Sequence, residues 1–450
     1  MTFIIVGAGV FGASTALVLA KRYPDREIIL IDRHQPPSPD GSSVDSSRIV
    51  RADYAKEEYT KLMIEAEAIW KGDRELSQHY RPSGLLLCDE GQTGYVKEAY
   101  QVVTRLAVPQ SLEPLSGLRS IKEKMRTSPS GQSDPIKMKD EEDERWSGYV
   151  NWSSGWADAE ASTLLFVKRA IAMKNVRFIQ AQVAHLLYEN TREDSKVLGV
   201  QSADGRKLKA DLTILACGAW TAQITDLTGH CLSTGQVLAY FKVTPEEEEK
   251  YKNMPIIFDL TSGCFLIPPH NGEMKVARHA MGYENPKKIP HWRGRGHVTV
   301  SVPRTSVTHP NEQIPAEGEE ELRRWLQIFT PEFANRPFTK TRVCWYTDTP
   351  TGDFVITHHP HHQGLFIATG GSGHGFKFLP VLGEKIADCV QNRLEESLKK
   401  LWQWKDIPKE ATRGDGSRGR GDRIDISKMY NDPADVHNGE YPVQPPFSKL

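Results

Sequence analysis

The sequence of 450 residues contains only six cysteines, and none of them forms a Cys-x-x-Cys pair. Cysteines this sparse argue against a disulfide framework and fit a reducing compartment. No apolar run reaches the length of a transmembrane helix, and residues 1–23 are broken by glycines and lack a basic n-region. We therefore expect neither a membrane span nor a secretory signal.

Charge of one sign is also lacking, because the net charge is −1. Nothing therefore argues for nucleic acid or an anionic membrane as a partner. Hydrophobic residues make up 38% of the chain and charged residues 26%, as in an ordinary globular protein with a large core. The length suggests about two to three domain-sized units, and nothing demands more than a monomer.

The first 33 residues are typical of a dinucleotide site. A β-run at residues 2–6 leads into the glycine turn GAGVFG, an Ala/Leu-rich helix and a second β-run at residues 27–31. Gly7 permits the tight turn, Gly9 lets the backbone approach a pyrophosphate, and Gly12 allows close helix–strand packing. Asp32 can accept a ribose hydroxyl. The candidate cofactor-binding residues here are Gly7, Gly9, Val10, Phe11, Gly12 and Asp32.

Two later segments repeat a strand that empties into glycine. ADLTILACGAW ends at Cys217 and Gly218, and LFIATGGSGHGFKF leads into a further helix. Between them, residues 231–303 are rich in β-runs. This order predicts an α/β fold, with a Rossmann-type domain built from separated segments and a β-sheet-rich domain inserted. We assign the nucleotide domain to 1–60, 150–230 and 340–395, the substrate domain to 61–149 and 231–339, and an extended tail to 405–450.

Two polar stretches fall outside these units. Residues 121–146 are charged and Ser/Pro-rich, which predicts a surface excursion, and KEATRGDGSRGRGDRID at 409–425 predicts disorder. The last three residues, Ser448, Lys449 and Leu450, match the tripeptide that the peroxisomal import receptor reads. We therefore expect a peroxisomal protein.

A histidine-rich stretch, HHPHHQG at residues 358–364, invites comparison with a metal site. No second cluster of ligands has suitable spacing, and the stretch lies between two β-runs. We favour a solvated turn and expect no metal.

Four blocks of the sequence together resemble the sarcosine-oxidase family of flavoproteins, which includes L-pipecolate, saccharopine and fructosyl-amino-acid oxidases. The blocks are IIVGAGVFGASTA…IILID, SSRIVRADY, KVARHA and CWYTDTP…ATGGSGHGFKFLP. The resemblance implies FAD bound covalently through Cys344. Arg342, two residues away, can favour the reactive thiolate. The alternative for Cys344 is a buried structural thiol, which we prefer for Cys88, Cys217, Cys231 and Cys389.

The resemblance also implies roles for charged and polar residues. Arg51 and Lys377 would bind the substrate carboxylate, which an arginine can meet with two hydrogen bonds. Lys275, with Arg48 adding charge, would speed the reaction with oxygen. Alternatively, Arg48 and Arg51 form a surface pair and Lys275 faces solvent. The pocket lining would include Tyr346, His279 and His374, and further cofactor contacts would come from Ser47, Arg48, Cys217, Gly218, Gly371, Gly373, Gly375, Phe376 and Lys377.

Cys264 marks a departure from this resemblance, because sarcosine-type relatives carry tyrosines near the substrate at this place. We therefore expect an altered pocket. The predicted activity is FAD-dependent oxidation of the C–N bond of a carboxylate-bearing secondary or N-methylated amino acid, with O2 reduced to H2O2. Alternatives are a biosynthetic flavin oxidase, a fructosyl-amino-acid oxidase, a flavin dehydrogenase with another electron acceptor, and a redox-silent dinucleotide-binding protein.

Overall fold

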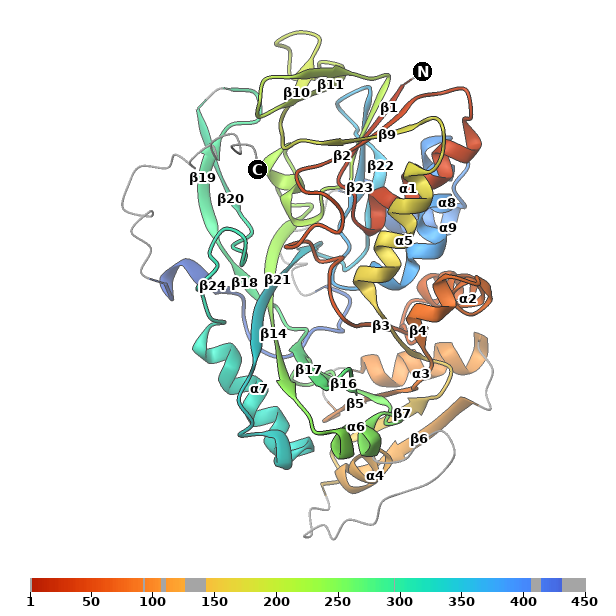
Figure 1. Cartoon of the computed structure of the whole chain (residues 1–450), viewed down its shortest axis with the longest axis vertical. Coiled ribbons are helices and arrows are strands. Elements are labelled where there is room, and N and C mark those ends of the chain that lie inside the picture. Colours follow the sequence, from red (N-terminus) through yellow and green to blue (C-terminus); the bar gives the residue numbers. More distant parts are fainter. Residues whose placement is uncertain are drawn as a thin grey trace.

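The computed structural model describes residues 2–91, 94–106, 111–125, 143–294, 296–405 and 414–430. Its first sheet lies in the upper part of Figure 1 and has six described strands in the order β22-β23-β13-β1-β2-β9. All neighbours are parallel except β22 and β23. The strands are β1 (Phe3–Val6), β2 (Ile28–Asp32), β9 (Val176–Gln180), β13 (Leu212–Leu215), β22 (Val355–His358) and β23 (Leu365–Thr369).

The strands of this sheet are apolar throughout because both faces are covered. Phe3 and Ile5 pack with the helices on one face, whereas Ile4 and Val6 pack with a small sheet on the other. Figure 1 shows the helices together at the right of the sheet. The helices are α1 (Val10–Arg22), α5 (Ala159–Ile171) and α8 (Leu379–Val390). The small sheet on the other face consists of β10 (Val183–Tyr188), β11 (Val197–Ser202) and β12 (Lys207–Lys209).

The second sheet has ten described strands. Nine of them follow the order β24-β18-β14-β17-β16-β15-β5-β7-β6, and the tenth, β21, pairs with β14. The long strands β14 and β21 rise toward the first sheet in Figure 1. The strands are β5 (Leu85–Asp89), β6 (Leu112–Ser116), β7 (Ser147–Asn151), β14 (Leu232–Lys242), β15 (Ile256–Asp259), β16 (Cys264–His270), β17 (Glu273–Arg278), β18 (Tyr283–Glu284), β21 (Lys340–Asp348) and β24 (Ile424–Asp425).

Side chains of the second sheet alternate between two cores. Met274 and Val276 of β17 pack in the core that includes α7, whereas Ala277 packs in the core shared with the first sheet. Period-2 alternation places Lys275 on that shared side as well. The remaining elements are α2 (Glu57–Gly72), α3 (Tyr95–Leu106), α4 (Gly117–Lys124), α6 (Pro245–Tyr251), α7 (Ala316–Phe329), α9 (Glu396–Trp402), β3 (Arg48–Val50), β4 (Tyr80–Arg81), β8 (Gly155–Ala157), β19 (Pro286–Pro290) and β20 (His297–Ser301), with 3-10 turns at Leu76–His79, Gly218–Gln223, Pro331–Phe333, Phe376–Phe378 and Ile426–Lys428.

The fold class predicted from the sequence is confirmed: a parallel dinucleotide-binding sheet is assembled from separated segments beside a large β-sheet unit. One boundary differs. We assigned residues 340–348 to the nucleotide domain, but β21 pairs along its whole length with β14 of the second sheet.

The disorder predicted for residues 409–425 is wrong over the part that the structure describes. Residues 414–430 pack against the second sheet, and β24 pairs in parallel with β18. Residues 126–142 of the predicted excursion, residues 409–413, and Ser448, Lys449 and Leu450 lie outside the described residues. Among the described helices, none is long and apolar enough to cross a membrane.

Candidate active site

The glycine turn between β1 and α1 has the backbone approach that its sequence predicts. Gly7 has a φ of 104°, which favours glycine, and a Cβ on Gly12 would lie 1.8 Å from the Gly7 carbonyl oxygen. The N-cap of α1, Gly9, makes no side-chain capping bond, and the first turn carries no acidic residue. The N-terminus of α1 is therefore available to an anion such as a pyrophosphate.

A cavity with an empty volume of about 1510 Å³, which includes space open to solvent, begins at this turn. Its lining includes most of the predicted cofactor residues: Gly7, Gly9, Val10, Phe11, Asp32, Arg48, Cys217, Gly218, Gly371, Gly373, Gly375 and Phe376. Gly12, Ser47, Cys344 and Lys377 are not among the residues that line it. The glycine cradle, the helix N-terminus and the acid at the end of β2 fit a dinucleotide such as FAD.

Several lining residues were not predicted from the sequence. The Ser43 hydroxyl accepts a hydrogen bond from the Val10 amide at 3.1 Å, so it fixes the loop over the helix N-terminus. The Arg33 guanidinium lies 4.0 Å from the centre of the Trp220 ring, and both residues border the cavity. Arg33 directly follows the predicted Asp32, so its position was the one signal available for it.

Cys344 lies in β21 on the face shared with the first sheet, and it is 1% exposed. Arg48 Nη2 lies 3.1 Å from its Sγ, closer than Arg342 Nη2 at 3.9 Å. The sequence pointed to Arg342 as the cation beside this thiol, but Arg48 is the nearer one. Tyr346, two residues along β21, lies on the same face and borders the cavity.

A buried carboxylate that the sequence did not reveal organises this side of the cavity. Asp45 Oδ2 lies 2.7 Å from Lys275 Nζ and 2.8 Å from Arg48 Nη1, and the Tyr240 hydroxyl donates to Oδ1. Lys275 also donates to the Ser47 carbonyl at 2.7 Å, so Ser47 acts through its backbone. Lys275 is 3% exposed, which excludes the solvent-facing alternative.

The charges of this cluster shift each other's ionisation. Burial alone would raise the pKa of Asp45, but the positive charges of Arg48, Lys275 and Arg342 outweigh it and hold that pKa below its usual value. Burial lowers the pKa of Lys275 to about 8, although the charge of Asp45 opposes the shift. Lys275 therefore loses its proton more readily than an exposed lysine does.

The two residues predicted to bind a substrate carboxylate come together on the other side. The Arg51 guanidinium lies 4.6 Å from the centre of the Tyr54 ring, and Lys377 Nζ lies 5.4 Å from the same centre. Arg51 is 5% exposed and Lys377 4% exposed, so neither belongs to a surface pair. Arg51 Nη1 is buried without a hydrogen-bond partner in the part of the chain that the structure describes, and Lys377 Nζ donates to the His374 carbonyl at 3.1 Å.

The two predicted pocket histidines are buried and uncharged. Burial, with Lys377 nearby, lowers the pKa of His374 to about 3, and burial holds the pKa of His279 well below its usual value. His374 Nε2 is 2.8 Å from the Gly352 carbonyl oxygen, so this nitrogen carries the proton and Nδ1 accepts from the Tyr54 hydroxyl at 3.2 Å.

Close packing at Gly373 connects the cavity to His279. A Cβ on Gly373 would lie 2.5 Å from the Tyr346 ring and 2.7 Å from His279 Cε1. Phe258 packs edge-on against His279 at 5.9 Å and also lies 5.9 Å from the Arg51 guanidinium. The predicted pocket residues therefore pack together next to the cofactor cavity, and Tyr346 and Gly373 border it.

The expectation that Cys264 shapes this pocket is wrong. Cys264 is fully buried in the core beneath α7, whereas Phe265, the next residue of β16, packs on the cofactor side. Strand alternation turns the two side chains to opposite faces. Phe258 and Phe265 therefore supply the aromatic surface here.

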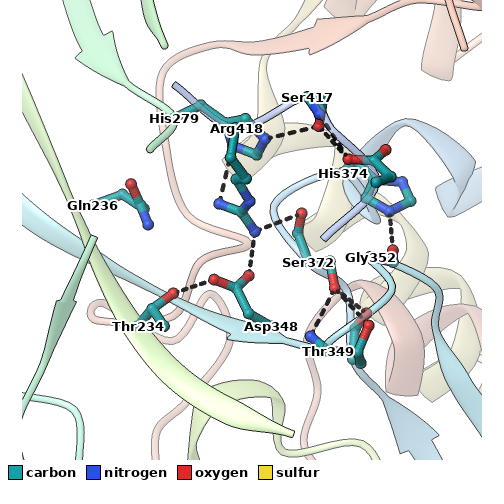
Figure 2. Close-up of polar contacts among 12 residues, drawn as sticks. Thr234, Gln236, His279, Asp348, Thr349, Gly352, Ser372, His374, Ser417 and Arg418 are labelled. Carbon is teal, nitrogen blue, oxygen red and sulfur yellow. Dashed lines mark hydrogen bonds and ion pairs between the residues drawn. The ribbon is translucent and has the colours of Figure 1, made fainter. Parts of the chain in front are cut away.

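The C-terminal segment completes the site. Arg418 donates to the Asp348 carboxylate, to the Ser372 carbonyl at 3.1 Å and to His279 Nδ1 at 3.4 Å. The Ser417 hydroxyl lies 3.5 Å from His279 Nε2. Figure 2 shows Arg418 reaching from this segment between His279 and Asp348. No sequence pattern indicated these contacts.

The histidine-rich turn does not form a metal site in the described residues. Within those ranges, no group of three or more His, Cys, Asp or Glu side chains is arranged to hold an ion. His359 instead stacks on His362 at 4.7 Å and packs against Trp404 at 4.9 Å.

Comparisons with known proteins agree with this geometry. The family model described as FAD dependent oxidoreductase matches residues 2–389. An L-saccharopine oxidase from Schizosaccharomyces pombe is 32% identical, covering 91% of this chain and 94% of that protein. A monomeric sarcosine oxidase from Bacillus sp. is 26% identical, covering 86% and 91%. The solved fructosamine oxidase Amadoriase II from Aspergillus fumigatus has a TM-score of 0.78 and 29% identity, covering 96% of each chain.

Proposed function

This chain belongs to the family of FAD-dependent oxidoreductases and acts on CH–NH donors, and on that premise we propose that its substrate is a carboxylate-bearing secondary or N-methylated amino acid. The observation that carries the proposal is the buried pair Arg51 and Lys377. Arg51 Nη1 has no partner among the described residues, and Lys377 uses one of its three N–H groups on a carbonyl. Buried donors without acceptors are costly unless a ligand supplies them, and a carboxylate does.

The pocket walls orient the rest of the substrate. With its carboxylate held by Arg51 and Lys377, the substrate amine would lie toward Tyr346 and Gly373, which border the cofactor cavity. Both histidines are neutral, so they add no positive charge beside an amine that must be uncharged to release a hydride. FAD, when bound, supplies the hydride acceptor and passes the electrons to O2 to give H2O2.

We propose that Cys344 holds FAD covalently through its sulfur. The support is the Arg48 contact at 3.1 Å, because a guanidinium beside sulfur favours the thiolate that forms such a bond. Lys275 provides a positive charge where oxygen is reduced. Two of its three N–H groups are used on Asp45 and Ser47, which leaves one for a ligand.

We also propose that the protein is imported into peroxisomes through Ser448, Lys449 and Leu450, where the peroxide can be removed. We expect it to act as a monomer. Loss of punctate localisation on deletion of the tripeptide, in a fluorescently tagged protein, tests the first proposal. Elution of the holoenzyme at the size of one chain tests the second.

A fructosyl amino acid is a second candidate substrate, because the chain resembles a fructosamine oxidase over 96% of its length. An anaerobic titration distinguishes the two. The visible flavin band is followed while sarcosine, L-pipecolate, L-proline, L-saccharopine, fructosyl-lysine and N-methylated aromatic amino acids are added separately. Bleaching by a secondary or N-methylated amino acid supports the first candidate, and bleaching by fructosyl-lysine alone would replace it with the second.

A further inference from the structure

The segment Gly414–Gly421 has a defined place against the pocket. Its backbone amides donate to the second sheet's loops: Gly414 to the Pro350 carbonyl at 3.1 Å and Gly419 to the His279 carbonyl at 2.9 Å. A Cβ on Gly419 would lie 2.2 Å from the Ser262 carbonyl oxygen, so only glycine permits this approach. These contacts hold the segment beside the substrate site.

Arg418 anchors the segment. Besides Asp348, Ser372 and His279, it donates to the Ala280 carbonyl at 3.2 Å, and its guanidinium lies 5.5 Å from the centre of the Tyr346 ring. Asp348 is held in turn by the Thr234 hydroxyl, as Figure 2 shows. With partners inside the protein on both terminal nitrogens, Arg418 positions the segment and is not a free cation for substrate.

Asp415 differs from Arg418 because one of its oxygens is free. Oδ1 accepts from the Ser417 amide at 3.1 Å and from the Ser417 hydroxyl at 2.6 Å. No described residue donates to Oδ2, and Asp415 is only partly buried, so this oxygen can still accept a hydrogen bond. Burial opposes ionisation, but the two Ser417 bonds and the positive charge of Arg418 keep the pKa of Asp415 below its usual value, so it is charged at neutral pH.

The position of Asp415 links it to the predicted carboxylate site. A Cβ on Gly352 would lie 3.1 Å from Asp415, and the Gly352 carbonyl is the partner of His374 Nε2 at 2.8 Å, so Asp415 lies next to the loop that holds His374. Its negative charge also acts on Lys377. A substrate carboxylate that takes Lys377 and Arg51 would supply Lys377 with a second negative charge beside Asp415. Lys377 and Arg418 balance the charge of Asp415 in the free protein. A substrate carboxylate at Lys377 takes up part of that balance, and a positive group on the substrate restores it.

We propose that Asp415 determines substrate specificity by pairing with a second positively charged group of the substrate, in addition to the amine that is oxidised. The favoured substrate is then an amino acid that carries one carboxylate for Arg51 and Lys377 and a further ammonium for Asp415. This proposal rests on the proposed function, which places the substrate carboxylate at Arg51 and Lys377. It adds that Asp415 selects for a second positive group on the substrate.

The test uses two compounds that differ in one group, Nα-methyl-L-lysine and Nα-methyl-L-norleucine. Their binding to the holoenzyme is measured by anaerobic calorimetry, and the rate of flavin reduction is measured separately. We expect the wild-type protein to bind the lysine compound at least about tenfold more tightly, as hydrogen bonds to charged groups allow. Asp415→Asn should abolish this preference by weakening only the lysine compound.

Asp422→Asn is the matched control, because Asp422 ends the second Arg-Gly-Asp triplet of this stretch, as Asp415 ends the first, and is exposed. It removes the same charge and should keep the preference of the wild type. Ser417→Ala leaves the Asp415 charge but removes one bond that orients it, and should reduce the preference by about threefold. If Asp415→Asn does not fold, the preference for the lysine compound is compared between Ser417→Ala and Asp422→Asn. A preference that is equal in these two variants would then overturn the proposal.

Equal binding of the two compounds by the wild type would overturn the proposal. So would an Asp415→Asn variant whose affinity changes by the same factor for both compounds. In those cases Asp415 only balances Lys377, and the proposed function stands. Failure of the proposed function has a different signature: neither compound reduces the flavin in wild type or Asp422→Asn, whatever the calorimetry shows.

Discussion

Two pairs of buried cations lie near the cofactor cavity, and they differ in their partners. Lys275 and Arg48 share the fully buried carboxylate of Asp45. Within the described ranges, Arg51 keeps an unpartnered Nη1, and Lys377 has only a backbone carbonyl within hydrogen-bond distance. The first pair is neutralised within the protein, whereas the second lacks an anion that touches it.

This difference indicates which pair serves a ligand. A buried cation with a permanent carboxylate can tune its surroundings without binding anything further. Arg51 and Lys377 have the charge of Asp53 nearby, and Lys377 also that of Asp415, but no described carboxylate bonds to them. A substrate carboxylate is the group that fits two such donors. The comparison therefore supports our proposal that the first pair serves the cofactor side and the second binds substrate.

The largest expected effect concerns Cys344, the thiol that Arg48 contacts on the cofactor side. Cys344→Ser should release all FAD into the supernatant on acid precipitation, because a hydroxyl does not form the proposed bond. The colour of the acid pellet measures this directly, with Cys389→Ser as the control for loss of another thiol. A wild-type pellet that is already colourless would contradict covalent attachment at Cys344.

The next largest effect concerns the unpaired cations. Arg51→Met should reduce kcat/KM for the amino acid substrate by about two to three orders of magnitude, since removing a partner of a buried charge costs about 3–5 kcal/mol. Steady-state kinetics measure it. Arg119→Met, at an exposed position, should leave kcat/KM unchanged. A loss in Arg51→Met of less than threefold would remove Arg51 from the carboxylate site.

Lys275→Met tests the paired side. Reoxidation of the reduced flavin by O2 should slow by about two orders of magnitude, as expected when one charge that stabilises a developing anion is lost. Flavin reduction by substrate should change by no more than a few-fold, because Lys275 does not belong to the carboxylate site. Stopped-flow measurement of both half-reactions separates these effects, and an unchanged reoxidation rate would contradict the assignment.

The smallest effect is a shift in pH dependence. Because the pKa of Lys275 is about 8, its positive charge is present below that pH, and the reoxidation rate should fall as pH rises through about 8. The charge of Asp45 raises this pKa, so Asp45→Asn should move the fall to lower pH. A profile that shifts upward in Asp45→Asn would show that another group titrates.

Parts of the site that are formed by residues adjacent in sequence could be predicted, and parts formed by distant residues could not. The turn from Gly7 to Gly12 is contiguous, so its role follows from the sequence. Asp45 lies 230 residues from Lys275 along the chain, and no spacing rule connects them. The error at Cys264 was one of strand face, because a shift by one residue exchanges the two sides of a sheet.

The C-terminal segment shows a different limit. Its composition of Gly, Arg and Asp is typical of disorder, yet Gly414, Gly416 and Gly421 adopt positive φ angles in a folded turn. Gly352 also has a positive φ, and a Cβ there would lie 3.1 Å from Asp415. Such packing depends on a distant loop, which composition does not reveal.

The central claim, that Arg51 and Lys377 recognise a carboxylate, is tested most directly with two compounds and two proteins. The best substrate of the anaerobic panel and its decarboxylated analogue are compared by kcat/KM in the wild type and in Arg51→Met. The account predicts a preference for the acid of at least about a hundredfold in the wild type, reduced to less than tenfold in the variant. Equal use of both compounds by the wild type would contradict it.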